Sequence, residues 1–150
     1  MTAVPTPKTP PWPTLGPGEQ QLPPQPEELL LRQVHPSYFD GNEITEMAFY
    51  PGSSSRQCSC SRSTLQTAQG AYDHHTGKLE LKSVGTCAVS VQEVVDAGSR
   101  AVDDSAVQTH VPPTPGHTYI DFRTLGKDER SFIRDDLAAA ATARGFLYTP

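Results

Sequence analysis

The segment with most of the chain's reactive side chains runs from residue 56 to residue 77 and reads RQCSCSRSTLQTAQGAYDHHTG. It contains two of the three cysteines, Cys58 and Cys60, and the adjacent pair His74 and His75. Thiols and imidazoles could ligate zinc, or a thiol could act as a nucleophile with an imidazole as its base. The third alternative, which we favour, is that the segment is the junction between a strand and a helix.

The spacing of these residues is unlike that of a structural zinc site. Such a site takes four Cys or His ligands, commonly in pairs separated by two to four residues. Cys58 and Cys60 are separated by one residue, and adjacent histidines point about 100° apart on a helix. Cysteine is also among the most buried residue types. We therefore predict that Cys58, Cys60 and Cys87 fill the interior and that the protein binds no metal.

A cysteine nucleophile would need a cation or a helix N-terminus to stabilise its thiolate. Cys60 shortly precedes a predicted helix, but the sequence assigns it no oriented base. Three further histidines lie near proline or glycine, and we expect structural roles for them: His35, His110 and His117. The carboxylate pairs at 103–104 and 135–136 are adjacent, so their side chains diverge and neither pair faces one substrate bond as acid and base. The leading interpretation therefore contains no catalytic residue.

One set of residues resembles the Arg, Ser-Thr-Ser, Glu pattern of ADP-ribosyltransferases. It consists of Arg32, the segment 59–61 and Glu93. The resemblance implies that Arg32 holds NAD, that Ser59 orders the nicotinamide ribose and that Glu93 stabilises an oxocarbenium-like transition state. Cysteine replaces the central threonine of that pattern, and Val91 stands where many members have a polar partner for the glutamate. A small NAD-using transferase is therefore the alternative function.

Composition narrows the class of protein. The chain has 150 residues, which suits one domain. Its net charge of −5 disfavours sequence-independent binding to nucleic acid. No apolar run approaches the roughly 20 residues of a membrane-spanning helix, and the N-terminus lacks the apolar core of a secretory signal. Three cysteines are too few for a disulfide framework and suit a reducing compartment. We expect a cytoplasmic protein that contacts neither nucleic acid nor membrane.

The first 26 residues differ from the rest of the chain. They contain nine of the fifteen prolines and no periodic hydrophobic pattern, which predicts a disordered arm rich in extended segments. Trp12 stands between prolines in TPPWPTLGP and could anchor the arm in a partner's groove. The folded domain is expected over residues 27–149.

Hydrophobic periodicity predicts the elements of this domain. Alternation favours strands at 29–34, 45–50, 57–61, 83–91 and 117–122. Helical spacing favours helices at 64–75 and 127–144, with a short helical turn at 92–99. The segment 83–91 has the pattern of a central strand. We expect a single α+β domain with a mainly antiparallel sheet of four to six strands, covered on one face by the two helices.

The stretch LLRQVHPSYF and most of residues 29–148 resemble small uncharacterised bacterial proteins. That resemblance implies no activity. Because the residues define no catalytic set, the leading interpretation is a non-enzymatic intracellular accessory module that binds a protein partner and needs no cofactor. The alternative, an ADP-ribosyltransferase-like enzyme that uses NAD, requires that Arg32, Ser59 and Glu93 share one cleft.

Overall fold

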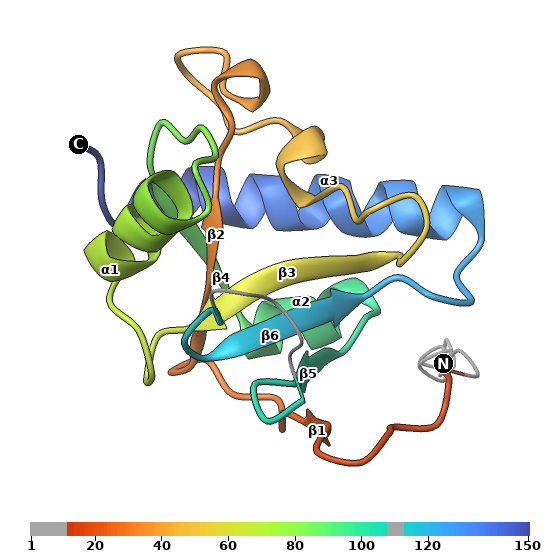
Figure 1. The fold of residues 1–150 in the computed structure, drawn as a ribbon. Helices are drawn as coiled ribbons and strands as arrows, with labels where there is room; N and C mark the ends of the chain where they lie inside the picture. The colour runs from red at the N-terminus through yellow and green to blue at the C-terminus, as the bar shows by residue number, and fades with distance from the viewer. Residues whose placement is uncertain (1–11, 108–112) are drawn as a thin grey trace.

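The computed structural model describes residues 12–107 and 113–150. One antiparallel sheet of six strands forms its centre, in the order β1-β5-β6-β3-β2-β4 (Figure 1). The strands are β1 (Gln20–Gln21), β2 (Leu29–Gln33), β3 (Gln57–Arg62), β4 (Thr86–Ser90), β5 (Ala101–Asp103) and β6 (His117–Asp121). The predicted α+β class and the antiparallel sheet are confirmed.

In the described residues, three α-helices accompany the sheet: α1 (Ala68–Asp73), α2 (Val91–Ala97) and α3 (Lys127–Arg144). Helix α1 begins at Thr67, whose hydroxyl accepts a hydrogen bond from Gly70 N at 2.9 Å, and it continues into a π-helical turn, His74–Lys78. The helix therefore begins later and ends later than the pattern at 64–75 predicts. No helix in the described part of the chain has both the length and the apolar character needed to cross a membrane.

The helices cover both faces of the sheet, not one face as predicted. Because side chains alternate along a strand, Leu30 and Leu31 point to opposite faces. Leu30 belongs to the main core with α2 and α3, whereas Leu31 packs with Ala71 of α1 and Ala88 of β4. Helix α3 runs along the back of the sheet in Figure 1, and α1 lies on the other side. The small α1 leaves much of its face uncovered, and the candidate site lies there.

The structure differs from the prediction at two of the predicted strands. The segment 45–50 is a 3-10 turn, Glu46–Phe49, in which the adjacent residues Ala48 and Phe49 are both buried; a strand would send them to opposite faces. Strand β4 was expected at the centre of the sheet and is at its edge. It is apolar on both faces because α1 and α3 cover it, and Tyr148 bridges Thr86 along its free side.

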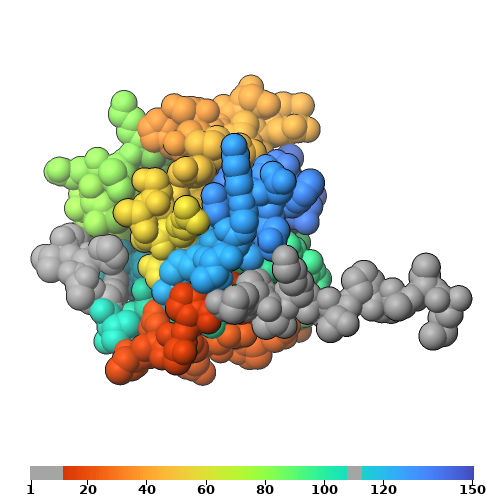
Figure 2. Space-filling model, turned by 90° about the vertical axis from the view of Figure 1, so that its right-hand side faces the viewer, coloured from red at the N-terminus to blue at the C-terminus, as the bar shows by residue number. Residues whose placement is uncertain are grey.

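The N-terminal segment joins the domain earlier than residue 27. Strand β1 pairs with β5, and Leu22 is buried in the main core. Figure 2 shows the described N-terminal residues, in red, lying against the blue chain that contains β6. The predicted disordered arm is therefore wrong for residues 12–26, because β1 and Leu22 give them partners that a composition argument does not reveal. Residues 1–11 lie outside the described part of the chain, as does His110.

Candidate ligand-binding pocket

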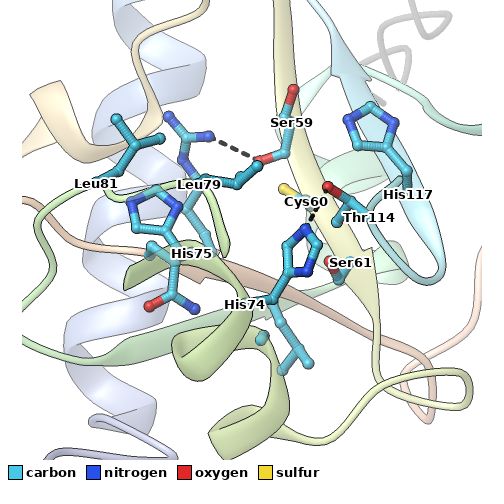
Figure 3. A pocket seen from close by; sticks show the side chains of 13 residues that line it. Ser59, Cys60, Ser61, His74, His75, Leu79, Leu81, Thr114 and His117 are labelled. Carbon is cyan, nitrogen blue, oxygen red and sulfur yellow. Dashed lines mark hydrogen bonds between the residues drawn. The ribbon is translucent and has the colours of Figure 1, made fainter. Parts of the chain in front are cut away.

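A pocket of about 590 Å³ opens on the face of the sheet that α1 leaves uncovered. Strands β2, β3 and β6 form its floor, and α1 with the π-helical turn forms one wall (Figure 3). Its lining is Leu31, Arg32, Gln33, Ser59, Cys60, Ser61, Ala71, His74, His75, Leu79, Leu81, Thr114 and His117. This volume lies within the range of small-molecule sites, and the described residues of the lining supply apolar, hydroxyl and imidazole groups but no carboxylate.

The pocket exists because β2 and β3 separate. Their pairing is limited to Leu30 with Arg62 and Leu31 with Ser61, while the rest of β3 pairs with β6 on its other side. Arg32 fills the opening. Its Nη1 donates to Ser59 O at 2.7 Å, and its Nε donates to Ala48 O at 2.8 Å. The side chain thus replaces hydrogen bonds that a continuing β2 would have made, and its guanidinium is held rigidly in the pocket wall.

Arg32 also brings an unneutralised charge to the pocket. It is half-buried, and among the described residues no carboxylate forms an ion pair with it; its Nη2 makes no hydrogen bond to any of them. Five other arginines pair with carboxylates: Arg62, Arg100, Arg123, Arg134 and Arg144. A desolvated cation without a counter-charge is unfavourable, so an anion that reaches Arg32 gains more than it would at the solvated surface.

The imidazoles at the wall add hydrogen-bonding groups and little charge. Burial lowers the pKa of His74, and the Lys78 ammonium lowers it further. Burial and Arg32 also lower the pKa of His75, which outweighs the opposing effect of its hydrogen bond with the Lys82 backbone. Both rings are therefore neutral at pH 7, and Arg32 supplies the pocket's positive charge. His74 Nε2 lies 3.1 Å from Thr114 Oγ1, as the dashed line in Figure 3 shows.

A second group of polar side chains occupies the floor at the border of β3 and β6. His117 is buried, and its Nδ1 lies 2.5 Å from Asp104 Oδ1. The strand register places Ser61 directly opposite His117. Ser61 is only 6% exposed, and its hydroxyl makes no hydrogen bond to another described residue. Asp104 therefore orients the imidazole, while Ser61 lies on the neighbouring strand of the pocket floor.

The three thiols lie in the main core, as predicted. Cys58, Cys60 and Cys87 are free, and none is more than 4% exposed. The side-chain hydrogen bond with Cys60 and the nearby Arg32 charge lower the pKa of Cys58, whereas burial raises that of Cys87 to about 12. Among the residues described, no group of three or more His, Cys, Asp or Glu side chains could hold a metal ion. Packing therefore accounts for the thiols' positions.

The residues of the ADP-ribosyltransferase pattern do not all meet. Arg32 and Ser59 line the pocket, but Glu93 does not. Glu93 is the third residue of α2, where its carboxylate accepts from Ser90 N at 2.7 Å and from Arg144 Nη1 at 2.7 Å. Burial opposes its ionisation, but these hydrogen bonds outweigh burial and lower the pKa of Glu93. The structure assigns Glu93 a capping role and leaves the pocket without this carboxylate.

Comparisons with protein-family models, with curated proteins and with solved structures found no match. The chemistry of the pocket is therefore inferred from the geometry of the pocket itself.

Several pocket residues were not predicted as a group from the sequence. From the sequence, His117 is given a structural role, His74 and His75 are considered only as zinc ligands, and Asp104 is set aside as half of an unsuited acid–base pair. One available signal is the alternation in β3, which places Ser59 and Ser61 on the face opposite the thiols. The pairing of Ser61 with His117 needs the strand order, which no local pattern contains.

Proposed function

We propose that the protein is a ligand-binding module whose pocket takes a small molecule with one anionic group and one apolar part. The observation that carries this proposal is the half-buried Arg32 guanidinium, which faces a pocket whose described lining residues include no carboxylate. The chain as a whole has a net charge of −5, so the positive charge of the pocket is opposite in sign to the net charge of the molecule. Such a local field favours anions in this pocket over the rest of the surface.

The lining also indicates the shape of the ligand. Leu31, Ala71 and Leu79 supply apolar surface beside the guanidinium, while the Ser59 hydroxyl and the imidazoles supply directional hydrogen bonds. An arginine binds phosphate or carboxylate through charge-assisted hydrogen bonds. A ligand with a phosphate or carboxylate at Arg32 and an aliphatic or aromatic group against the leucines satisfies both kinds of surface.

The sequence-based interpretation of a binding module is compatible with this proposal, but its protein partner is replaced here by a small molecule. A protein-docking face would show clustered exposed apolar side chains. Phe132 and Leu65 have the most exposed large hydrophobic side chains among the residues the structure describes; Phe132 lies on α3, and Leu65 lies in the turn between β3 and α1. The pocket is the more specific feature.

Titration calorimetry with phenyl phosphate tests the proposal, with inorganic phosphate and phenol as the separate halves of the probe. Phenyl phosphate should bind more tightly than either half. Arg32→Gln should weaken its binding at least about tenfold, since a charge-assisted hydrogen bond contributes about 1.5–3 kcal/mol.

A second pair of variants avoids disturbing the sheet. Leu81 lines the pocket and is 51% exposed, so substitutions there should be tolerated. Leu81→Glu should weaken phenyl phosphate binding by repulsion, and Leu81→Lys should strengthen it. Arg56 is exposed and lies outside the lining, so Arg56→Gln is the matched control for a lost positive charge. Absence of binding by the wild type, or affinity equal to that of the wild type in both Arg32→Gln and Leu81→Glu, would refute the proposal.

A further inference from the structure

We propose that His75 is a second anion-binding residue of the pocket and that it takes up a proton when an anion binds. This inference rests on the proposed function and concerns the regulation of the same site by pH. His75 and Arg32 both line the pocket. Helix α1 packs against β2, so the π-helical turn that continues α1 lies beside the strand that contains Arg32.

The backbone of the turn fixes the imidazole at the pocket wall. Leu79 N donates to His74 O, and Leu81 N donates to His75 O, each at 3.0 Å. Both leucines line the pocket on the same side as the two imidazoles, as Figure 3 shows. A ligand with its apolar part against these leucines and its anionic group at Arg32 therefore lies within reach of His75.

All the charged or titratable groups that act on His75 in the described part of the chain are basic. Burial lowers the pKa of this imidazole most, and three groups lower it further: Arg32 on β2, His74 on the same turn and His35 after β2. The hydrogen bond with the Lys82 backbone opposes them, and no described carboxylate acts on the ring. Without an anion in the pocket, His75 therefore has no counter-charge and is neutral at pH 7.

A bound anion supplies the missing counter-charge. An opposite charge within about 4–6 Å raises the pKa of a histidine, and an anion at Arg32 also offsets the repulsion between the guanidinium and an imidazolium. Proton binding and anion binding therefore favour each other, and the coupling is the same in both directions. Because the pKa of His75 is higher in the complex than in the free protein, affinity rises as the pH falls between these two values and is constant outside them.

His74 provides the matched control. It belongs to the same wall, but its Nε2 lies 3.1 Å from Thr114 Oγ1. Burial and the Lys78 ammonium lower its pKa, and Arg32 is not among the causes. The proton taken up on anion binding is therefore assigned to His75 and not to His74.

Titration calorimetry with benzenesulfonate tests the inference, because a sulfonate keeps its charge between about pH 5.5 and about pH 8. Phenyl phosphate is unsuitable here, since a phosphate monoester loses its second proton at about pH 6. The dissociation constant of the wild type should fall at least about fivefold from the higher pH to the lower one. Titrations in two buffers with different ionisation enthalpies should show net proton uptake between these limits.

The variants locate the proton. His75→Gln should remove both the proton uptake and the pH dependence, and at about pH 8 it should bind benzenesulfonate within about twofold of the wild type, because the imidazole is neutral there. His74→Gln should retain both effects. An NMR titration of the His75 imidazole in the wild type, with and without benzenesulfonate, compares the two pKa values directly and does not depend on the folding of a variant.

Three results would overturn the inference: an affinity that does not change with pH, a pH dependence that persists in His75→Gln, or the same titration of His75 with and without benzenesulfonate. Absence of benzenesulfonate binding at both pH values would overturn it as well. Phenyl phosphate binding that is weakened by Arg32→Gln would in each case leave the proposed function standing, so the two proposals fail separately.

Discussion

Arg32 connects the core with the pocket. The strand register places Arg32 opposite Cys87 on β4. Its guanidinium also interacts electrostatically with Cys58 and Cys60 in the main core. Its hydrogen bonds to Ser59 O and Ala48 O close the opening between β2 and β3. The same residue therefore supports the sheet and presents a cation to the pocket. A lysine could not reproduce both roles, because its single ammonium lacks the planar set of donors.

The burial of the thiols predicts their reactivity. A thiol must be ionised and accessible to attack a disulfide reagent, and none of the three cysteines is more than 4% exposed. In the native protein, Ellman's reagent should therefore react with fewer than one equivalent over minutes, and with all three thiols after denaturation in guanidinium chloride. Rapid reaction of Cys60 with Ellman's reagent in the native protein would contradict the assignment of the thiols to the core.

At the scale of elements, Glu28 holds the start of β2 to the end of β3. Its carboxylate is 2% exposed and accepts hydrogen bonds from Arg62 Nε and from the side chains of Ser63 and Thr64. Burial alone would raise the pKa of Glu28, but these hydrogen bonds outweigh burial and hold the pKa below its ordinary value of 4.5. The group is therefore charged in the folded protein at neutral pH and fully bonded.

Loss of this carboxylate should destabilise the fold. Glu28→Gln is expected to lower the free energy of unfolding by about 3 kcal/mol at pH 7, because it leaves buried donors poorly satisfied. The folded-state pKa is lower than the unfolded one, so the wild type loses this advantage as the pH falls below 4.5 and through the folded pKa. Urea denaturation across this range should show the two proteins converging. Glu27→Gln, at the adjacent exposed carboxylate, should differ little from wild type at any pH.

The capping role of Glu93 leads to a separate expectation. Glu93→Ala should lower the free energy of unfolding by about 1 kcal/mol, since it removes a reciprocal cap and a surface ion pair. The dissociation constant for phenyl phosphate should change by less than about twofold, because Glu93 does not line the pocket. The ADP-ribosyltransferase alternative predicts instead that the protein consumes NAD and that Glu93→Gln abolishes this turnover. An assay of NAD loss distinguishes the two.

The success of the sequence-based predictions also depends on the element. Strands β2, β3 and β6 and helix α3 have clear periodicities, and the structure contains them close to the predicted bounds. The segment 45–50 alternates equally well, but packing against α3 makes it a helical turn. The pocket was beyond local patterns, because it depends on the separation of β2 from β3 and on the register of β3 with β6. Arg32 and Ser59 were singled out, but their common pocket was not derivable.

At the scale of the whole molecule, the N-terminal segment closes the β1 side of the sheet. Tyr119 donates to Glu19 at 2.6 Å, and Arg100 donates to Pro13 O at 2.9 Å while its guanidinium lies 5.1 Å from the centre of the Trp12 ring. Trp12 is half-buried against its own domain. The residue proposed as an anchor for a partner therefore contacts the domain itself.

Truncation should reveal this contribution. Deletion of residues 1–22 removes β1 and the buried Leu22, and we expect it to lower the free energy of unfolding by about 3 kcal/mol or more. Deletion of residues 1–11 removes neither, and the fluorescence of Trp12, the chain's one tryptophan, should still shift to the red on unfolding. Equal stability of the wild type and the longer deletion in urea would show that residues 12–22 do not stabilise the domain.

The central claim is that the pocket on the open face of the sheet binds an anion at Arg32. A crystal structure of the protein with phenyl phosphate tests it most directly. We predict a phosphate oxygen about 3 Å from the Arg32 guanidinium and the phenyl ring against Leu79 and Leu81. Phosphate density at another cluster of cations, such as Arg56 and Lys127, with an empty pocket at Arg32, would contradict the claim.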